Sequence, residues 1–212
     1  IIFNLYKDLI NINYLILIIF LFFLISNSFN FQDGEDVNIF VLLFFIFSLF
    51  YFYSNQQITR DVSLLILSYL ICFGFFNRKP NTLFFGDSGC YIVTIILFIF
   101  FINELNNLNL IKSVSAILLF PLTDIGLVII YRILKKENLL SRNYHHIYQK
   151  LSIKTDGLIY LLPNIFFAIA NFYLLKYLYL NLFNIIYILL FNLFSCLIIQ
   201  FLIYKFLRNV NK

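Results

Sequence analysis

Long uninterrupted apolar runs, separated by short polar stretches, form most of this chain. About seven such runs can be drawn, near residues 11–29, 37–54, 62–76, 90–103, 113–133, 157–180 and 182–207. The apolar residues are continuous rather than alternating, and backbone polar groups in lipid must be hydrogen-bonded within their own segment. The pattern therefore predicts an all-α, polytopic integral membrane protein, with residues 1–212 forming a single transmembrane domain.

Composition supports this class. The chain is 62% hydrophobic and 12% charged, with a mean hydropathy of +0.92, whereas soluble domains are about half apolar and a quarter charged. The net charge of +5 is not gathered in a dense basic tract, so nucleic acid is not an expected partner. The three cysteines are scattered, which favours free thiols over a disulfide framework.

The alternation of runs and loops places the polar stretches 27–38, 77–90 and 135–156 on one membrane face. Eleven of the 15 lysines and arginines fall on that face. By the positive-inside rule, we expect these loops and the carboxyl terminus to be cytoplasmic. Seven of the ten acidic residues lie on or near the same face. This favours a metal-bridged, multiply anionic substrate, while a set of solvated loops is the alternative interpretation.

The first polar stretch has acids and amides at a regular spacing. Asn27, Asn30 and Asp33 are three residues apart, and Gly34 and Asp36 follow. At the end of a helix this spacing places the polar groups roughly on one side, where they can converge on one ligand. A helix cap or a turn is an equally good explanation.

The second polar stretch reads NRKPNTLFFGDSGC over residues 77–90. Gly86 and Gly89 flank Asp87 and allow the backbone to approach a phosphate closely, and the carboxylate offers hard oxygen to a divalent cation. A tight turn is the alternative. Phe84 either stacks on a base or anchors the loop at the membrane interface.

Two further features lie in the second half of the chain. Asp124 sits inside an apolar run just after Pro121, and an ionisable group there is by default functional or paired; Arg132, about two turns on, is a candidate partner. Structural pairing and catalysis both remain open. Residues 142–150 form a basic loop with both histidines, suited to holding a diphosphate. Adjacent histidines without cysteine are a poor zinc ligand set.

The order and spacing of these four features resemble the polyprenyl-phosphate N-acetylhexosamine-1-phosphate transferases of glycosyltransferase family 4, relatives of phospho-N-acetylmuramoyl-pentapeptide transferase. The N-x-x-N-x-x-D-G-x-D-G-L motif is matched by residues 27–38, with Val37 and Asn38 in place of Gly-Leu. The N-x-x-P-A and F-x-G-D-x-G-S motifs are matched within residues 77–90, with Asn81 for Ala and Cys90 for Ser.

The later motifs continue this similarity. Residues 121–124 match P-L-x-D, and residues 146–149 match H-x-Y-Q. The H-x-Y-Q form is more similar to the branch that acts in O-antigen, lipopolysaccharide and related surface glycan synthesis.

The resemblance implies transfer of N-acetylhexosamine-1-phosphate from a UDP-N-acetylhexosamine to polyprenyl (undecaprenyl) phosphate, with release of UMP, at the bacterial inner membrane. It implies Mg²⁺ as cofactor, with Mn²⁺ as an alternative, and Asp87 as the metal ligand. The catalytic residues would be Asp33, Asp36 and Asp87, and the substrate-binding residues Asn27, Asn30, Asn77, Phe84 and His146. Homodimerisation is left open.

One family feature is missing. Family members carry an aspartate-rich D-D-x-x-D loop in further amino-terminal helices, and this sequence contains no Asp-Asp pair. The chain begins at Ile1 and contains no methionine. We therefore expect it to be the carboxyl-terminal part of a longer transferase; an inactive relative or a fragment of a membrane transporter are the alternatives.

Overall fold

The computed structural model describes residues 12–78, 83–138, 145–154, 159–177, 187 and 190–202, and every regular element in these ranges is a helix. The predicted all-α fold is thus confirmed for this part of the chain. The helices are α2 (Ile12–Gln32), α3 (Asn38–Tyr53), α4 (Gln57–Phe76), α5 (Gly86–Asn103), α6 (Leu108–Lys135), α7 (Ile147–Lys154), the short η1 (Ile159–Leu161) and α8 (Leu162–Tyr177). A last apolar helix covers Leu190–Leu202.

Three of the helices in the described ranges, α4, α5 and α6, are long and apolar enough to cross a membrane. Four shorter apolar helices accompany them: Ile16–Gln32, Asn38–Tyr53, Ile159–Asn171 and Leu190–Leu202. Each of the apolar runs in the sequence overlaps one of these helices. The architecture indicates an integral membrane protein, and the full set of about seven spans remains a prediction.

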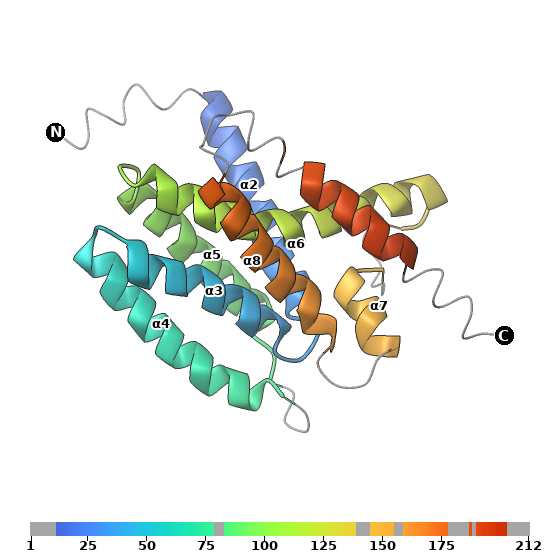
Figure 1. The fold of residues 1–212 in the computed structure, drawn as a ribbon, viewed down its shortest axis with the longest axis horizontal. Helices are drawn as coiled ribbons and strands as arrows, with labels where there is room; N and C mark the ends of the chain where they lie inside the picture. The colour runs from blue at the N-terminus through green and yellow to red at the C-terminus, as the bar shows by residue number, and fades with distance from the viewer. Residues whose placement is uncertain are drawn as a thin grey trace.

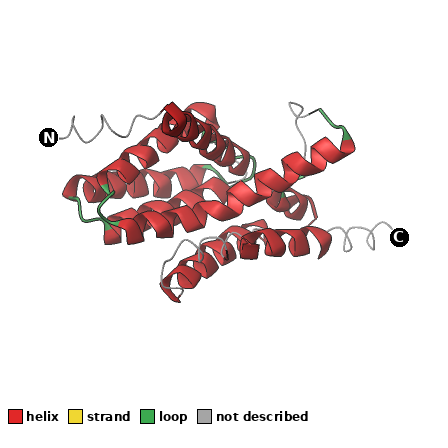
Figure 2. Ribbon diagram, turned by 90° about the horizontal axis from the view of Figure 1, so that it is seen from above, coloured by secondary structure: helices red, strands yellow, loops and turns green. Residues whose placement is uncertain are grey.

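Helix α6 extends along most of the molecule (Figures 1 and 2) and contacts α2 and α3 as well as α8. It begins where the Asn107 side chain accepts a hydrogen bond from the Leu110 amide, and it ends at Lys136, whose φ of 55° is left-handed. Such a left-handed residue is the usual way to close a helix and satisfy its last carbonyls. Helix α6 carries Asp124 in its buried middle section.

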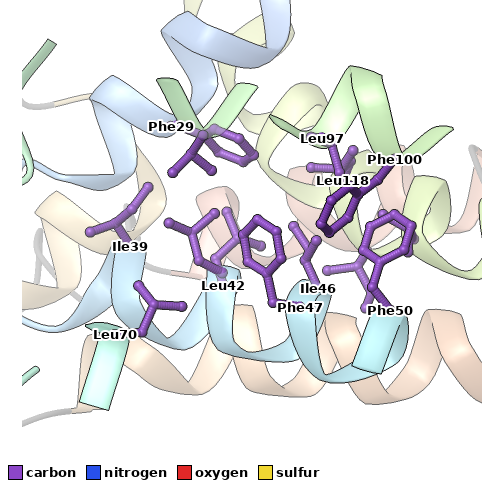
Figure 3. Packing of buried hydrophobic residues seen from close by; sticks show 14 of the residues in the cluster. Phe29, Ile39, Leu42, Ile46, Phe47, Phe50, Leu70, Leu97, Phe100 and Leu118 are labelled. Atoms are coloured by element: carbon purple, nitrogen blue, oxygen red, sulfur yellow. The ribbon is translucent and has the colours of Figure 1, made fainter. Parts of the chain in front are cut away.

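The main apolar core lies between helices α2 to α6, with α3 at its centre (Figure 3). Phe47 and Phe50 of α3 are fully buried, and the Phe50 ring meets Phe100 of α5 edge-on at a centroid distance of 4.9 Å. In a membrane, where the surrounding lipid is as apolar as these side chains, their close packing is what stabilises the core. The core fixes the helices relative to one another and leaves their polar ends to meet outside it.

A buried carboxylate joins two turns at one end of this core. Glu104, which is 1% exposed, accepts hydrogen bonds from the Ser54 hydroxyl and from the amides of Asn55 (3.3 Å) and Gln56 (3.3 Å). The α3–α4 turn and the α5–α6 turn therefore lie together, as the alternation of runs predicts. The polar stretches that resemble family motifs gather elsewhere.

Candidate functional site

The first two polar stretches meet where α2 ends and α5 begins. The Asp33 carboxylate accepts hydrogen bonds from the amides of Phe85 (2.9 Å) and Gly86 (2.8 Å). Gly86 has a φ of +74°, a conformation that glycine adopts without strain. The first amides of a helix have no partner within the helix, and the helix dipole favours an anion there. Asp33 thus caps the amino terminus of α5.

Asp87 lies close enough to Asp33 for its charge to act on that carboxyl group. The pKa of Asp33 is raised above its usual value: burial raises it most, the negative charge of Asp87 adds to this, and the two amide hydrogen bonds oppose it. Asp33 is only 4% exposed, whereas Asp87, in the first turn of α5, is exposed. The site therefore contains a buried acid, Asp33, that accepts hydrogen bonds from the backbone, and an exposed acid, Asp87, that a ligand can reach.

Asn77 ties the second stretch to the turn after α2. Its side chain is completely buried; Oδ1 accepts from the amide of Val37 (2.5 Å), and Nδ2 donates to the carbonyl of Leu83 (2.5 Å). Both ends of the amide are thus engaged by the chain itself. This arrangement favours a role for Asn77 in shaping the site.

Val37 has a left-handed backbone, with φ 61° and ψ −5°. A β-branched residue in this region is strained, at a cost of order 1–3 kcal/mol. The family resemblance expects glycine at this position, so the residue that departs from the motif is the one with the unfavourable conformation. The turn that carries Asp33 and Asp36 is consequently a strained one.

The histidine loop meets α6 through a buried pair. Nδ1 of His146 lies 2.8 Å from Oδ2 of Asp124, and the other carboxylate oxygen accepts from the Ile147 amide at 3.3 Å. The two side chains are 3% and 1% exposed. Since an ionised carboxylate only accepts, Nδ1 carries the proton of this hydrogen bond. Arg132, the partner expected for Asp124, instead contacts Glu137 at 3.9 Å.

The same loop packs against the end of α2. The His146 ring contacts those of Phe31 (centroid distance 4.8 Å) and Tyr148 (5.7 Å), and the Tyr148 hydroxyl donates to the Phe31 carbonyl. The loop also packs over Gly34: a Cβ there would stand in ordinary contact with the Tyr148 hydroxyl (3.4 Å) and Nε2 of Gln149 (3.5 Å), and tightly, at 3.1 Å, against the Phe31 carbonyl oxygen. Three polar stretches far apart in sequence thus meet at one place.

The last apolar helix contributes a polar side chain to this cluster. Gln200 accepts from the Lys150 ammonium through Oε1 (2.5 Å), and its Nε2 lies 3.5 Å from Oδ1 of Asp124. Burial lowers the pKa of Lys150, and the charge of Asp124 opposes that effect. Gln200 therefore links the Lys150 amine to the Asp124 and His146 pair.

The predicted site residues fall into three groups. Four are buried where the stretches meet: Asp33, Asp36, Asn77 and His146. Two are exposed beside them, Asp87 and the half-exposed Phe84. Two are exposed on α2, Asn27 and Asn30, and Asn27 donates to the Phe23 carbonyl of its own helix at 2.7 Å. Motif residues Pro80 and Asn81 and the basic Arg142 lie outside the described residues.

Other polar residues that support the site were not predicted. Asn164 of α8 donates to Oε1 of Gln32 (2.9 Å) and Oδ1 of Asn38 (2.6 Å), and the Tyr160 hydroxyl donates to the Asp36 carbonyl (2.8 Å). The only signal in the sequence is that Asn164 interrupts an apolar run. A buried amide among membrane helices usually bonds a neighbouring helix.

A magnesium ion is compatible with the donors present. Among the described residues no group of three or more His, Cys, Asp or Glu side chains forms a metal cluster. Magnesium, however, is usually bound by one or two carboxylates, several waters and the substrate phosphates. The exposed Asp87 carboxylate, with Asp33 nearby, fits that pattern.

The family model for glycosyl transferase family 4 matches residues 2–105. Over these residues the chain belongs to glycosyl transferase family 4. The matched region contains the first two polar stretches and ends before Asp124 and His146, which join the site through their contacts. Neither the curated proteins nor the solved structures provide a match to this chain. Family 4 membership implies a phosphoglycosyltransferase, with sugar-nucleotide and lipid substrates.

Proposed function

We propose that the protein transfers N-acetylhexosamine-1-phosphate from a UDP-N-acetylhexosamine to polyprenyl phosphate. In this reaction an oxygen of the lipid phosphate attacks the sugar-linked phosphorus of the nucleotide sugar. The bond from that phosphorus to the bridging oxygen of the diphosphate breaks, and UMP leaves. The product is a lipid diphosphate that carries the sugar, and it would initiate synthesis of a lipid-linked surface glycan.

One observation carries the proposal: the polar stretches at 27–38, 77–90 and 145–150 meet. Asp33 accepts hydrogen bonds from the amides of Phe85 and Gly86, and the Tyr148 hydroxyl donates a hydrogen bond to the Phe31 carbonyl. Acids, a helix amino terminus and a histidine loop are thereby gathered at one place. Phosphoryl transfer depends mainly on positioning and charge stabilisation, and these groups supply both.

The exposed Asp87 is the residue we assign to hold magnesium. When bound, this ion would neutralise charge on the diphosphate. Asp33 holds the amino terminus of α5 and so places Asp87. Asp36, on the turn between α2 and α3, would line the acceptor pocket.

His146 is assigned to bind the diphosphate. In this assignment Asp124 would keep the proton on Nδ1 and orient the ring, and Nε2 would be the atom that meets the diphosphate. In the charged form Nε2 donates a hydrogen bond to a phosphate oxygen. The half-exposed Phe84 is suited to stack on uracil, whereas Asn27 and Asn30 lie on the exposed side of α2 and are the weakest of the assignments.

Replacement of Asp87 by asparagine tests the assignment. Asp87→Asn keeps the size and removes the charge, so transfer should fall by about 10²-fold or more while the protein stays folded. The measurement is transfer of labelled sugar to polyprenyl phosphate in magnesium. Asp61→Asn, which changes an exposed acid at the start of α4, is the control and should keep full activity. Near-normal transfer by Asp87→Asn would remove Asp87 as the metal ligand.

A further inference from the structure

The turn between α2 and α3 carries two of the acids assigned to the reaction, and its backbone is strained. Asp33 and Asp36 lie on this turn, and Val37 at its end has a φ of 61°. A strained conformation persists only where surrounding contacts determine it. The contacts that hold this turn therefore decide where the two acids lie.

Four buried side-chain amides, those of Gln32, Asn38, Asn77 and Asn164, and one hydroxyl surround the turn. Asn38 donates to Oε1 of Gln32 at 2.6 Å, which connects the two ends of the turn directly. Asn164 of α8 donates to both of these residues, at 2.9 Å to Gln32 and 2.6 Å to Asn38. Gln32, Asn38 and Asn164 are 1%, 0% and 3% exposed. The hydroxyl is that of Tyr160 in η1, which directly precedes α8, the helix that carries Asn164.

The remaining contacts fix the backbone inside the turn. The amide of Val37 donates to Asn77, and the carbonyl of Asp36 accepts from the Tyr160 hydroxyl at 2.8 Å. Tyr160 is 6% exposed. Asn77, at the end of α4, thus holds the turn from one side, and η1 and α8 hold it from the other.

We propose that Asn164, with Tyr160, is a positioning residue that holds the strained turn and thereby sets the placement of Asp33 and Asp36. Both residues lie beyond the part of the chain that matches the family. Asn38 stands where the family motif has leucine, and Asn164 donates directly to it. This inference rests on the proposed function for its effect on catalysis, but not for its effect on the turn.

The test is a double-mutant cycle between Asn164→Leu and Val37→Gly. Glycine adopts the left-handed backbone without strain, so the turn should need less support in that background. Asn164→Leu should lower the melting temperature of the full chain, and Val37→Gly should reduce this fall to less than half. Unfolding can be followed through exposure of the buried Cys90 and Cys196 thiols to a reactive dye, in a Cys72→Ser background because Cys72 is exposed.

Asn171→Leu is the matched control. Asn171 is a fully buried amide on the same helix, but it bonds Asn192 and the Ala116 carbonyl. Its replacement should lower the melting temperature equally in both backgrounds, because its partners are not on the turn. If Asn164→Leu also lowers the melting temperature equally in both backgrounds, the positioning role is overturned.

A second variant covers the case in which Asn164→Leu does not fold. Tyr160→Phe removes a single oxygen and should show the same coupling to Val37→Gly; additive effects would again contradict the proposal. In the transfer assay, Asn164→Leu should lower kcat about tenfold with a smaller change in KM, and Val37→Gly should restore part of kcat. If the unmodified protein transfers no sugar, the proposed function fails, while the melting temperatures still decide the positioning role.

Discussion

At the scale of single residues, Val37 shows how the surroundings can hold a residue in a backbone conformation that suits glycine. The backbone has the left-handed conformation that suits the glycine of the family motif, although valine occupies the position. Three kinds of contact hold it there. The Val37 amide donates to Oδ1 of Asn77, the side chain of the next residue, Asn38, donates to Gln32, and the valine side chain packs against the cluster that contains Tyr160. The conformation is therefore set by the surroundings rather than by the residue.

A comparison of Val37→Gly with Val37→Ala isolates this strain. Both variants remove the branched side chain, but only glycine relieves the left-handed backbone. We expect Val37→Gly to be more stable to unfolding than Val37→Ala by about 1 kcal/mol, the reverse of the usual order of alanine and glycine in a helix. Thermal unfolding of the two variants in the same detergent is the measurement. An alanine variant as stable as the glycine variant would show that the turn is not strained.

At the scale of helices, two carboxylates perform similar tasks at different turns. Asp33 accepts hydrogen bonds from two backbone amides at the start of α5. Glu104, in the turn after α5, accepts hydrogen bonds from two backbone amides and a hydroxyl. Each joins the end of one helix to a loop far away in sequence. Helix α5 is therefore anchored at both ends by an acid, and only the Asp33 end carries candidate catalytic groups.

Replacement of Glu104 by glutamine separates these tasks. The amide keeps the shape but turns one accepting oxygen into a donor facing the Ser54 and Gln56 donors. We expect a loss of about 1–3 kcal/mol in the free energy of unfolding, with little change in kcat. Thermal unfolding and the transfer assay on the same preparation provide the two values. A large fall in kcat with normal stability would link this turn to the site.

The sequence alone predicted the helices and the shared location of the motif stretches, because continuous apolar runs and their alternation are local signals. It did not predict the partners of buried polar groups. Asp124 pairs with His146, 22 residues on, and Asn164 bonds Gln32, 132 residues away. Such pairs depend on how helices pack in three dimensions. The strained conformation of Val37 likewise follows from its neighbours, although its departure from the family motif marked the position.

At the scale of the whole molecule, the polar turns separate into two sets. The turns at Ser54–Gln56 and Glu104–Asn107 are joined through Glu104, while the stretches around Asp33, Gly86 and His146 form the candidate site. We expect the second set to face the cytoplasm, because most lysines and arginines accompany it.

Labelling with a membrane-impermeant maleimide tests this orientation. Single cysteines are placed at two exposed positions, Asn55→Cys and Lys135→Cys, in a background without the native cysteines. Asn55→Cys should react in intact cells, because we expect its turn on the outer side. Lys135→Cys, at the end of α6, should react only after the membrane is permeabilised. The reversed pattern would overturn the predicted topology.

The most direct test of the proposed function identifies the nucleotide released. The full-length protein is reconstituted in liposomes containing polyprenyl phosphate and supplied with magnesium and UDP-N-acetylhexosamine labelled in uracil. Transfer of the sugar phosphate predicts UMP in equal amount to a lipid-linked N-acetylhexosamine diphosphate, and both products should be lost in Asp87→Asn. Release of UDP instead of UMP, or no lipid-linked sugar at all, would contradict the account.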